Sequence, residues 1–224
     1  MNLFVCCPGG FGKEVIDSAR RINKFKNRWD ELYFANETCF IDSSIIGKEI
    51  YGTTLFTLDS VLEKYDLSSF EVAIASGEPS VRKAIYENLK ANNVKLATLV
   101  DNTAIVSETA KLGDGVIVLA ACYISSAAIL ENNVSLNAHA LVGHDSILKE
   151  NCVVSSAVNI GGNCTIGENS YIGMGAQIKQ GINIGKDAII GMGAIVYNDI
   201  PDCVIALGNP ARPMKNNIDR KVFK

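Results

Sequence analysis

Residues 160–190 read IGGNCTIGENSYIGMGAQIKQGINIGKDAII, and an isoleucine returns in them at every sixth position. The same register continues without a slip in both directions, and every member of the column is aliphatic: Val106, Leu112, Val118, Ile124, Leu130, Leu136, Val142, Leu148, Val154, Ile160, Ile166, Ile172, Ile178, Ile184, Ile190 and Val196. A helix repeats every 3.6 residues and a strand every two, so neither produces this spacing. A fixed six-residue period instead predicts a parallel β-helix.

A second column, of mostly small residues, runs two places before the aliphatic one, from Ala104 to Ala194. The large aliphatic side chain fills the interior of a coil, and the small residue near it lets the wall turn. Three hexapeptides make one triangular coil, so we expect residues about 18 apart to stack and the stretch to form roughly five coils. Each coil then buries its aliphatic residues only against its neighbours, as solenoids do.

The cysteines fit the same pattern. The chain has seven, and Cys122, Cys152 and Cys164 occupy the small column. A buried free cysteine packs as a small hydrophobic residue. We therefore expect these thiols in the core and not in disulfides, and a cytoplasmic location for the protein.

Length and charge limit the class of protein. With 224 residues, one or two domains are expected. Since the first hundred residues lack the six-residue period, we expect an N-terminal domain at 1–100, a β-helix at 101–200 and a cap and tail at 201–224. The net charge of −3 argues against a nucleic-acid partner. No apolar run reaches the roughly 20 residues that span a membrane, and the N-terminus MNLFVCCPGG lacks the basic region of a signal peptide.

Strand and helix patterns alternate over the first hundred residues, which predicts a small parallel α/β sheet of the Rossmann-like type. The expected strands are 2–7, 32–41, 70–75 and 95–100, with a short extended stretch at 52–58. The expected helices are 13–23, 59–64 (with Asp59 or Ser60 at its cap) and 81–92. The six-residue period ends after Val196 and turn residues follow at 199–202. The segment 204–213, with the polar tail after it, is the candidate cap for the open end of the coils.

A glycine-rich loop, Pro8–Gly12, joins the first expected strand to the first helix. Such a unit brings a phosphate to the amides of a helix N-terminus. The dinucleotide fingerprint G-x-G-x-x-G is only partly matched, because Cys7 stands at the first glycine while Gly9 and Gly12 fit the other two. A tight turn without a ligand and a mononucleotide or nucleotide-sugar site fit the loop equally well, and a full dinucleotide site fits it less well.

Two charged residues of this region stand where a nucleotide would bind. Asp42 ends the second expected strand, where an acid accepts hydrogen bonds from a ribose or a base edge. A turn residue at a strand end is the alternative. Arg82 lies in the first turn of the third expected helix, where it is either a phosphate ligand or, as we favour, a solvated charge.

The chain has two histidines, His139 and His144, and both fall within one coil. His144 follows a core position by two places, so we expect it near a corner and pointing outward, with Asp145 orienting its ring. His139 follows its core position, Leu136, by three places, so it differs from His144 in its position within the six-residue period. We consider a supporting or substrate-facing role for it. Gly162 lies one coil beyond His144, where a backbone amide without a side chain suits an oxyanion. A surface histidine and a turn glycine are the alternatives.

Short motifs are spread over the whole chain: Pro8-Gly9-Gly10-Phe11-Gly12-Lys13-Glu14-Val15, Phe40-Ile41-Asp42, Asn137, Gly143-His144-Asp145, Ile172-Gly173-Met174-Gly175-Ala176, Ile190-Gly191-Met192-Gly193-Ala194 and Gly208-Asn209-Pro210-Ala211-Arg212-Pro213. Together they resemble the sugar acetyltransferases of the NeuD and PglD type, within the hexapeptide-repeat acyltransferases. The resemblance implies a left-handed β-helix, a homotrimer, and acetyl-CoA bound in a groove between adjacent coils. It also implies that the N-terminal domain holds the nucleotide of a sugar acceptor.

The resemblance assigns roles to the matching positions. His144 is the implied catalytic base, Asp145 orients it, and the amide of Gly162 faces the acetyl carbonyl. The acceptor is expected to contact Gly9, Gly10, Phe11, Gly12, Asp42, Ser43, Asn137 and His139, and the CoA is expected to contact Gly162, Met174, Gly175, Ala176, Gly193 and Ala194.

Three positions depart from the family pattern. Val153 stands where a second histidine often contacts CoA, Ser43 stands where many nucleotide-sugar members have an acid, and Cys7 stands at the first loop glycine. The nucleotide base and the CoA contact are therefore left open by the sequence.

The sequence predicts an acetyltransferase that moves acetyl from acetyl-CoA to the amino group of a nucleotide-linked amino sugar, of the 4-amino-4,6-dideoxy type, in surface glycan biosynthesis. O-acetylation of sialic acid or another sugar is the alternative reaction, and a nucleotide-sugar-binding scaffold is the alternative without catalysis. A zinc hydratase on the same fold is disfavoured, and no metal is expected, because catalytic zinc usually takes three protein ligands and the chain has two histidines.

Overall fold

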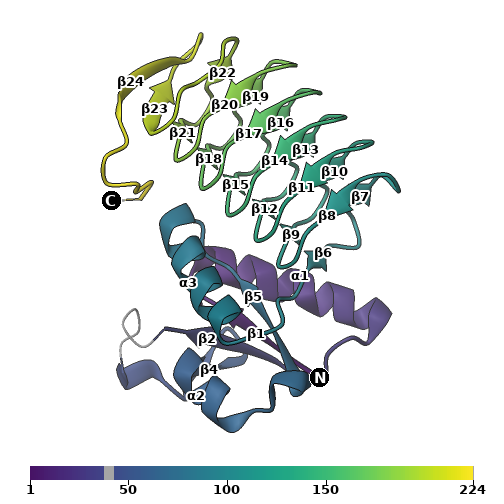
Figure 1. Ribbon diagram of the computed structural model, residues 1–224. Helices are drawn as coiled ribbons and strands as arrows, with labels where there is room; N and C mark the ends of the chain where they lie inside the picture. The colour runs from purple at the N-terminus through teal and green to yellow at the C-terminus, as the bar shows by residue number, and fades with distance from the viewer. Residues whose placement is uncertain (38–42, 224) are drawn as a thin grey trace.

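The structure is a computed structural model that describes residues 1–37 and 43–223, and Figure 1 shows its two parts one above the other. The lower part is a five-stranded sheet in the order β3-β4-β2-β1-β5. Its parallel strands are β1 (Asn2–Cys6), β2 (Leu32–Asn36), β4 (Thr53–Thr57) and β5 (Phe70–Ile74), and β3 (Glu49–Ile50) pairs antiparallel with β4. The helices are α1 (Gly10–Lys26), α2 (Leu58–Lys64) and α3 (Pro79–Ala91), with the 3₁₀ helices η2 (Ser43–Ile45) and η3 (Leu67–Ser69).

The sheet is covered on both faces, because successive side chains of a strand point to opposite sides. From β1, Leu3 and Val5 pack in the cluster that includes α1, while Phe4 and Cys6 pack in the cluster that includes α2 and α3. All four side chains are buried. A continuous apolar run is typical of strands covered on both faces, and the small parallel α/β sheet expected from the sequence is confirmed.

Several boundaries in this part differ from the expected ones. α1 begins earlier, at Gly10, because the glycine loop continues directly into the helix. β2 is shorter than expected, and Asp42 lies outside the described residues. The cap of α2 is Thr57, whose side chain accepts a hydrogen bond from the backbone N–H of Ser60, so the expected cap at Asp59 or Ser60 was wrong.

The upper part is a left-handed parallel β-helix with three walls of two-residue strands. Wall 1 contains β6 (Leu99–Val100), β9 (Ile117–Val118), β12 (Ser135–Leu136), β15 (Val153–Val154), β18 (Tyr171–Ile172) and β21 (Ile189–Ile190). Wall 2 contains β7 (Ile105–Val106), β10 (Tyr123–Ile124), β13 (Leu141–Val142), β16 (Asn159–Ile160), β19 (Gln177–Ile178) and β22 (Ile195–Val196). Wall 3 contains β8 (Lys111–Leu112), β11 (Ile129–Leu130), β14 (Ile147–Leu148), β17 (Thr165–Ile166) and β20 (Asn183–Ile184).

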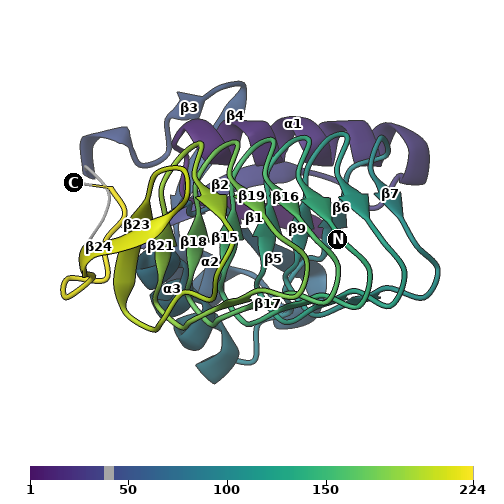
Figure 2. The same ribbon diagram turned by 90° about the horizontal axis from the view of Figure 1, so that it is seen from above.

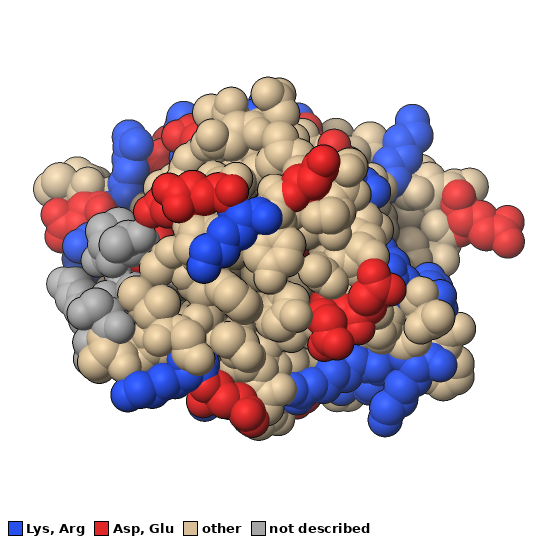
Figure 3. Space-filling model, turned by 90° about the horizontal axis from the view of Figure 1, so that it is seen from below, with Lys and Arg blue, Asp and Glu red and all other residues tan. Residues whose placement is uncertain are grey.

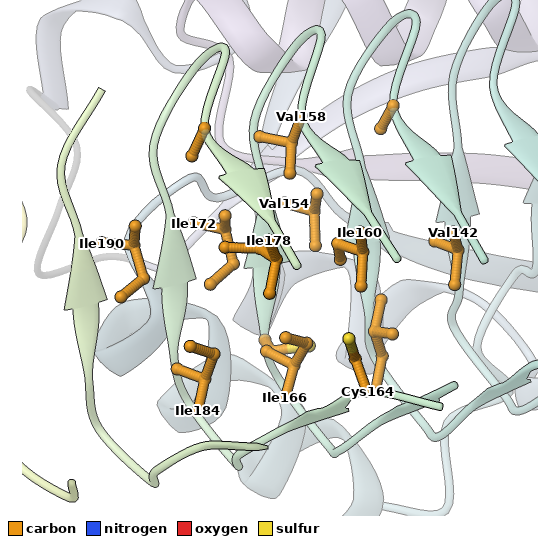
Figure 4. Packing of buried hydrophobic residues seen from close by; sticks show 14 of the residues in the cluster. Val142, Val154, Val158, Ile160, Cys164, Ile166, Ile172, Ile178, Ile184 and Ile190 are labelled. Carbon is orange, nitrogen blue, oxygen red and sulfur yellow. The ribbon is translucent and has the colours of Figure 1, made fainter. Parts of the chain in front are cut away.

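The predicted stacking of residues one coil apart is confirmed. Val142 in β13 pairs with Ile160 in β16, eighteen residues later, and the other strands of each wall follow the same offset. Figure 4 shows the aliphatic residues pointing into the interior of the coils. Cys122, Cys152 and Cys164 are buried among them as free thiols, as the small column predicted.

The end of the β-helix is covered by β23 (Val204–Leu207) and β24 (Arg212–Asn216). β23 adds in parallel to β21 of wall 1, and β24 pairs antiparallel with β23. Ala206 and Ala211 join the apolar core at this end. From β24 the chain turns back toward the lower part of the molecule, as Figure 1 shows.

Arg82 in α3 is completely buried, with none of its surface exposed. Its guanidinium donates to the carbonyl of Asn133 in the β-helix at 2.6 Å and to the carbonyl of Ile74 at the end of β5. Burial lowers the pKa of Arg82 to about 9. Both expectations for this residue, a phosphate ligand and a solvated charge, are therefore wrong, because its side chain joins α3 to the β-helix.

Asp101 joins α1 to the first coil. Its carboxylate accepts hydrogen bonds from Ser18 at 2.7 Å, from Thr103 at 2.7 Å and from Arg21 at 2.6 Å. Burial alone raises the pKa of Asp101, but hydrogen bonds from Thr103, Ser18 and Arg21 outweigh it and lower the pKa to about 2. The carboxylate is therefore charged in the folded protein at neutral pH.

We expect Asp101→Asn to lower the free energy of unfolding by about 1–3 kcal/mol at neutral pH, because buried donors lose a charged acceptor. The folded-state pKa lies below the unfolded value of about 3.9. The charged carboxylate therefore stabilises the fold above about pH 4, and this stabilisation is lost as the pH falls toward about 2. Urea unfolding at neutral and acid pH measures both effects. The difference in the free energy of unfolding between wild type and variant should become smaller in acid.

Asp30→Asn is the control for this prediction. Asp30 pairs with the N-terminal amine while 79% of its side chain is exposed, and an exposed pair contributes only about 0–1 kcal/mol. If wild type and Asp101→Asn differ in their free energy of unfolding by the same amount in acid as at neutral pH, the role given to Asp101 is contradicted.

The surface carries charges of both signs. On the face seen from below in Figure 3, Lys and Arg side chains are interspersed with Asp and Glu, and neither sign forms a broad patch. Such a face lacks the basic stripe that a nucleic-acid backbone requires. In the described part of the chain, no helix is both long enough and apolar enough to cross a membrane.

Candidate functional site

His144 and Asp145 lie on the corner between β13 and β14, and their side chains are 47% and 55% exposed. This confirms the outward position expected for His144. Nδ1 of His144 lies 2.8 Å from Oδ2 of Asp145. Because the carboxylate accepts the Nδ1–H, the neutral ring carries no proton on Nε2, which is the tautomer that a general base needs. Asp145 has a φ of 58°, in the left-handed region that aspartate tolerates better than most residues.

Gly162 lies directly against the imidazole of His144, one coil further along. A Cβ atom built at Gly162 would lie 2.5 Å from Nε2 and 2.6 Å from Cε1 of His144. Any side chain at this position would therefore displace the ring. The backbone also holds the two corners together, because the N–H of Asn163 donates to the carbonyl of His144 at 2.7 Å.

The amide N–H of Gly162 donates no hydrogen bond to the protein within residues 1–37 and 43–223. Most backbone N–H groups around it are used by the next coil; the N–H of Gly143, for example, donates to the carbonyl of Ile160 at 2.8 Å. A preorganised amide beside a base is the arrangement that stabilises an oxyanion in acyl transfer. The chemistry that this corner suits is therefore proton removal next to a polarised carbonyl.

Asn137 and His139 lie on a different corner, between β12 and β13. His139 is exposed and has a φ of 62°. Oδ1 of Asn137 is buried and accepts no hydrogen bond from the described residues, and a buried polar atom of this kind is normally paired. β13 separates this corner from that of His144, so the two histidines are not brought together within one chain.

The glycine loop between β1 and α1 is partly fixed by packing and partly open. A Cβ at Gly12 would lie 2.0 Å from the carbonyl oxygen of Cys7, so only glycine fits there. No atom lies within 4 Å of a Cβ built at Gly9 or Gly10, and Phe11 packs partly against the core beneath α1. The first turn of α1 therefore faces open space, and its N–H groups are free to hold a phosphate.

The first loop position, Cys7, has a φ of 74°, a conformation that favours glycine. This geometry explains why the dinucleotide fingerprint places a glycine there. The thiol is not reactive in this setting, because burial raises the pKa of Cys7 to about 11. The substitution thus keeps the turn of the fingerprint without adding a nucleophile.

α1 runs along the axis of the β-helix, as Figure 2 shows, and its C-terminal half contacts the first coil. Further toward its N-terminus, Glu14 shares a hollow with Ala138. From Glu14 to Gly10 the helix rises by about 6 Å, and neighbouring coils are about 4.8 Å apart. The glycine loop therefore lies beside the corner between walls 1 and 2, about one coil beyond Asn137 and at the level of Ser155.

Among the residues expected along the CoA, Gly162 lies beside His144. The others, Met174, Gly175, Ala176, Gly193 and Ala194, lie on the corner between walls 1 and 2. Met174 is 58% exposed, and Gly175 and Gly193 have open space where a Cβ would stand. Ala176 and Ala194 are buried in the core of the coils. Their side chains therefore fill the interior, and any contact that they make with a ligand must come from backbone atoms.

Two other expectations fall at the edge of what the structure describes. Asp42 lies outside the described residues, so its contact with a ribose stays a prediction. Ser43 is the first residue of η2, and its role in the acceptor site stays a prediction too. Within 1–37 and 43–223, no three or more His, Cys, Asp or Glu side chains are grouped to hold a metal ion.

Comparison with known proteins gives this geometry a context. The family model "Bacterial transferase hexapeptide (six repeats)" matches residues 145–180 and 163–198. Curated protein sequences give no match. Among solved structures, the acetyltransferase domain of PglB from Neisseria gonorrhoeae FA1090 has a TM-score of 0.86 and 31% identity, covering 95% of this chain and 99% of that one.

Two further structures share the fold over the whole chain. PerB from Caulobacter crescentus, in complex with CoA and GDP-perosamine, has a TM-score of 0.85 and 25% identity, covering 96% of this chain and 98% of that one. WeeI from Acinetobacter baumannii AYE has a TM-score of 0.85 and 24% identity, covering 96% of this chain and 100% of that one, and supports the fold alone. The PglB domain has also been solved in complex with acetyl coenzyme A.

Proposed function

This chain belongs to the hexapeptide-repeat sugar acetyltransferases, and we propose that it transfers acetyl from acetyl-CoA to the amino group of a nucleotide-linked 4-amino-4,6-dideoxy sugar. The observation that carries the proposal is the contact between the His144 imidazole and Gly162, which sets a base beside a free amide. The PglB complex with acetyl coenzyme A and the PerB complex with CoA and GDP-perosamine support the choice of substrates. Such a product would serve surface glycan biosynthesis.

His144 acts as the general base in this proposal. Nε2 takes a proton from the acceptor amine as its nitrogen attacks the thioester carbonyl, and Asp145, already paired with Nδ1, stabilises the imidazolium. A C–N bond forms and the C–S bond breaks. The proton then passes from the imidazolium to the departing thiolate, so that the ring is neutral again at the end of the cycle. Base catalysis of this kind contributes about 10²–10⁴-fold.

The amide of Gly162 stabilises the oxygen of the thioester carbonyl while it carries negative charge. The N–H has no competing acceptor among the described residues, so it needs no rearrangement to donate. Loss of one such donor typically costs about 10²–10³-fold in kcat. No covalent acyl-enzyme is needed, because the acceptor attacks the thioester directly.

The lower domain binds the nucleotide in this proposal. The open first turn of α1 at Gly9 and Gly10 takes the diphosphate. Phe11, Asp42 and Ser43 are the residues that we propose contact the ribose and base. The sugar then extends toward the β-helix. There the unpaired Oδ1 of Asn137 can accept a hydrogen bond from the sugar, and His139 lies on the same corner.

A homotrimer would complete the site. Wall 2 exposes a column of apolar side chains, with Ile105 63% exposed, Tyr123 46% and Leu141 37%. A surface of this kind marks a protein contact. Packing wall 2 against a second copy would bring the corner of His144 to a partner's corner of Met174, Gly175, Ala176, Gly193 and Ala194, where the CoA would lie.

Release of the free thiol from acetyl-CoA tests the function. We expect thiol release only when a nucleotide-linked 4-amino-4,6-dideoxy sugar is added, within a panel of UDP-, dTDP- and GDP-linked amino sugars and free sialic acids. The physical reason is that the thiol leaves only when an acceptor amine attacks the thioester and gives its proton to His144. The oligomeric state is measured on the same sample by sedimentation equilibrium, where a trimer is expected.

Other outcomes of the panel have defined meanings. If free sialic acid causes thiol release and no nucleotide sugar does, the reaction is O-acetylation and the proposed N-acetylation is wrong. Tight binding of a nucleotide amino sugar without any thiol release would identify the protein as a binding scaffold and contradict the proposed catalysis.

A further inference from the structure

The loop after β5 opens on the same edge of the sheet as the glycine loop. β1 and β5 are parallel neighbours, and the N–H of Ala75 donates to the carbonyl of Cys6 at 2.9 Å. The chain continues through Ser76, Gly77 and Glu78 into α3. β2 flanks β1 on its other side, so the crevice between the β1 and β5 loops is the switch point where open α/β sheets bind their ligands.

The C-terminal tail reaches this loop from the far end of the β-helix. After β24, Asn217 donates to the carbonyl of Asp187 at 2.9 Å, and Nε of Arg220 lies 3.7 Å from Oδ2 of Asp187. The backbone N–H groups of Val222 and Phe223 then donate to the carboxylate of Glu78 at 2.9 and 3.0 Å. The tail is therefore fixed to both parts of the protein, and Figure 1 shows it descending from β24 toward α3.

Phe223 and Tyr171 form an aromatic pair where the tail meets the two domains. Their ring centroids are 5.6 Å apart with an interplanar angle of 83°. A Cβ built at Gly77 would lie 3.6 Å from Cε2 of Phe223, so the ring rests against the loop after β5. Phe223 is nevertheless 58% exposed, which leaves much of the ring free for a ligand.

The aromatic pair is continuous with the corner that faces the glycine loop. Tyr171 lies in β18 of wall 1, and its hydroxyl oxygen accepts a hydrogen bond from Ser155 at 2.8 Å. Ser155 stands one coil above Asn137, the residue with the unpaired Oδ1. Ser155, Tyr171 and Phe223 therefore follow one another from this corner toward the loop after β5.

We propose that Phe223, supported by Tyr171, forms the apolar wall of the acceptor-sugar subsite and contacts the apolar face of the deoxy sugar. This inference rests on the proposed function. In this proposal the diphosphate binds at the first turn of α1 and the ribose lies on the side of β2. The sugar, at the opposite end of the diphosphate, then lies on the side of β5 and the β-helix. An aromatic ring offers a large apolar area at a fixed position, and the anchoring of the tail at Glu78 fixes this ring before the sugar arrives.

Phe223→Ala tests the proposal through the separate kinetic constants of the two substrates. We expect the KM for the nucleotide amino sugar to rise about tenfold, the scale of one aromatic contact. The KM for acetyl-CoA and kcat should stay within about twofold, because the thioester and His144 are not touched. Phe223→Tyr keeps the ring and should restore the KM. Phe25→Ala is the matched control, because it also removes an aromatic side chain from a surface position, 80% exposed on α1.

Calorimetry separates this proposal from the proposed function. Phe223→Ala should weaken binding of the nucleotide amino sugar while binding of the nucleoside diphosphate alone stays as in wild type. If the wild type acetylates a nucleotide amino sugar and Phe223→Ala has the same acceptor KM and affinity, the subsite proposal is overturned while the function stands. If the wild type neither binds nor acetylates any nucleotide amino sugar, the proposed function fails and this subsite fails with it.

Discussion

Replacing His144 with alanine is expected to lower kcat by about 10²–10⁴-fold, because the acceptor amine loses the base that removes its proton. The side chain is 47% exposed and its ring fills no core position. The fold, the oligomeric state and the KM for acetyl-CoA should therefore remain as in wild type. Initial rates of thiol release at saturating acceptor measure the effect.

Lys111→Ala is the matched control for this variant. Lys111 is an exposed coil residue on wall 3 and lies away from the corner of His144. It should leave both kcat and the thermal unfolding midpoint unchanged. Wild-type turnover by His144→Ala would rule out His144 as the base.

Gly162→Ala is expected to lower kcat by about 10²-fold without unfolding the protein. The new Cβ would lie 2.5 Å from Nε2 of His144, so the imidazole must move by about 1 Å or more, and a displacement of this size costs about 10²-fold in an oriented reaction. The ring can swing toward solvent because it is half exposed. The thermal unfolding midpoint should therefore change little, while kcat, measured by thiol release, falls.

The double variant His144→Ala, Gly162→Ala shows whether Gly162 acts through the ring. Alanine at 162 meets no imidazole when residue 144 is also alanine, so the second substitution should add little to the first. Coupled residues of one catalytic unit behave in this non-additive way. Full activity of the single variant Gly162→Ala would contradict the close contact between Gly162 and His144.

The β-helix could be predicted from the sequence because its packing is local and periodic. Each coil contacts only the next, so the position of Val142 or Cys164 within the period already decides whether its side chain faces the core. The same phase placed His144 outside and Gly162 one coil away. The exact contact between the ring and the Cα of Gly162 needed coordinates, because it depends on side-chain torsions that the period does not set.

Features that depend on contacts between distant segments were not predictable. Arg82 looked exposed because a charged residue in the first turn of a helix usually is. Its burial requires carbonyl acceptors from β5 and from Asn133, fifty-one residues later in the chain. The tail has no period at all, so nothing in its residues indicated that Phe223 would return to Gly77 and Tyr171.

The division of the site between two corners is implicit in the 18-residue coil, because Met174 stands 30 residues after His144 and therefore cannot stack on it. The structure shows that strands of wall 2 lie between the two corners. This separation gives the proposed trimer a mechanistic purpose. In the proposed trimer one chain would supply the base and a partner would supply the CoA surface, and we expect the monomer alone to be inactive.

The most direct test of the central claim is to identify the acetylated atom in the product by NMR and mass spectrometry. The sample is wild-type protein incubated with acetyl-CoA and a nucleotide-linked 4-amino-4,6-dideoxy sugar. We predict a single acetyl group bound as an amide to the sugar nitrogen, absent when His144→Ala is used. An acetyl ester on a sugar hydroxyl with the amine left free, or an equal yield of amide from His144→Ala, would contradict it.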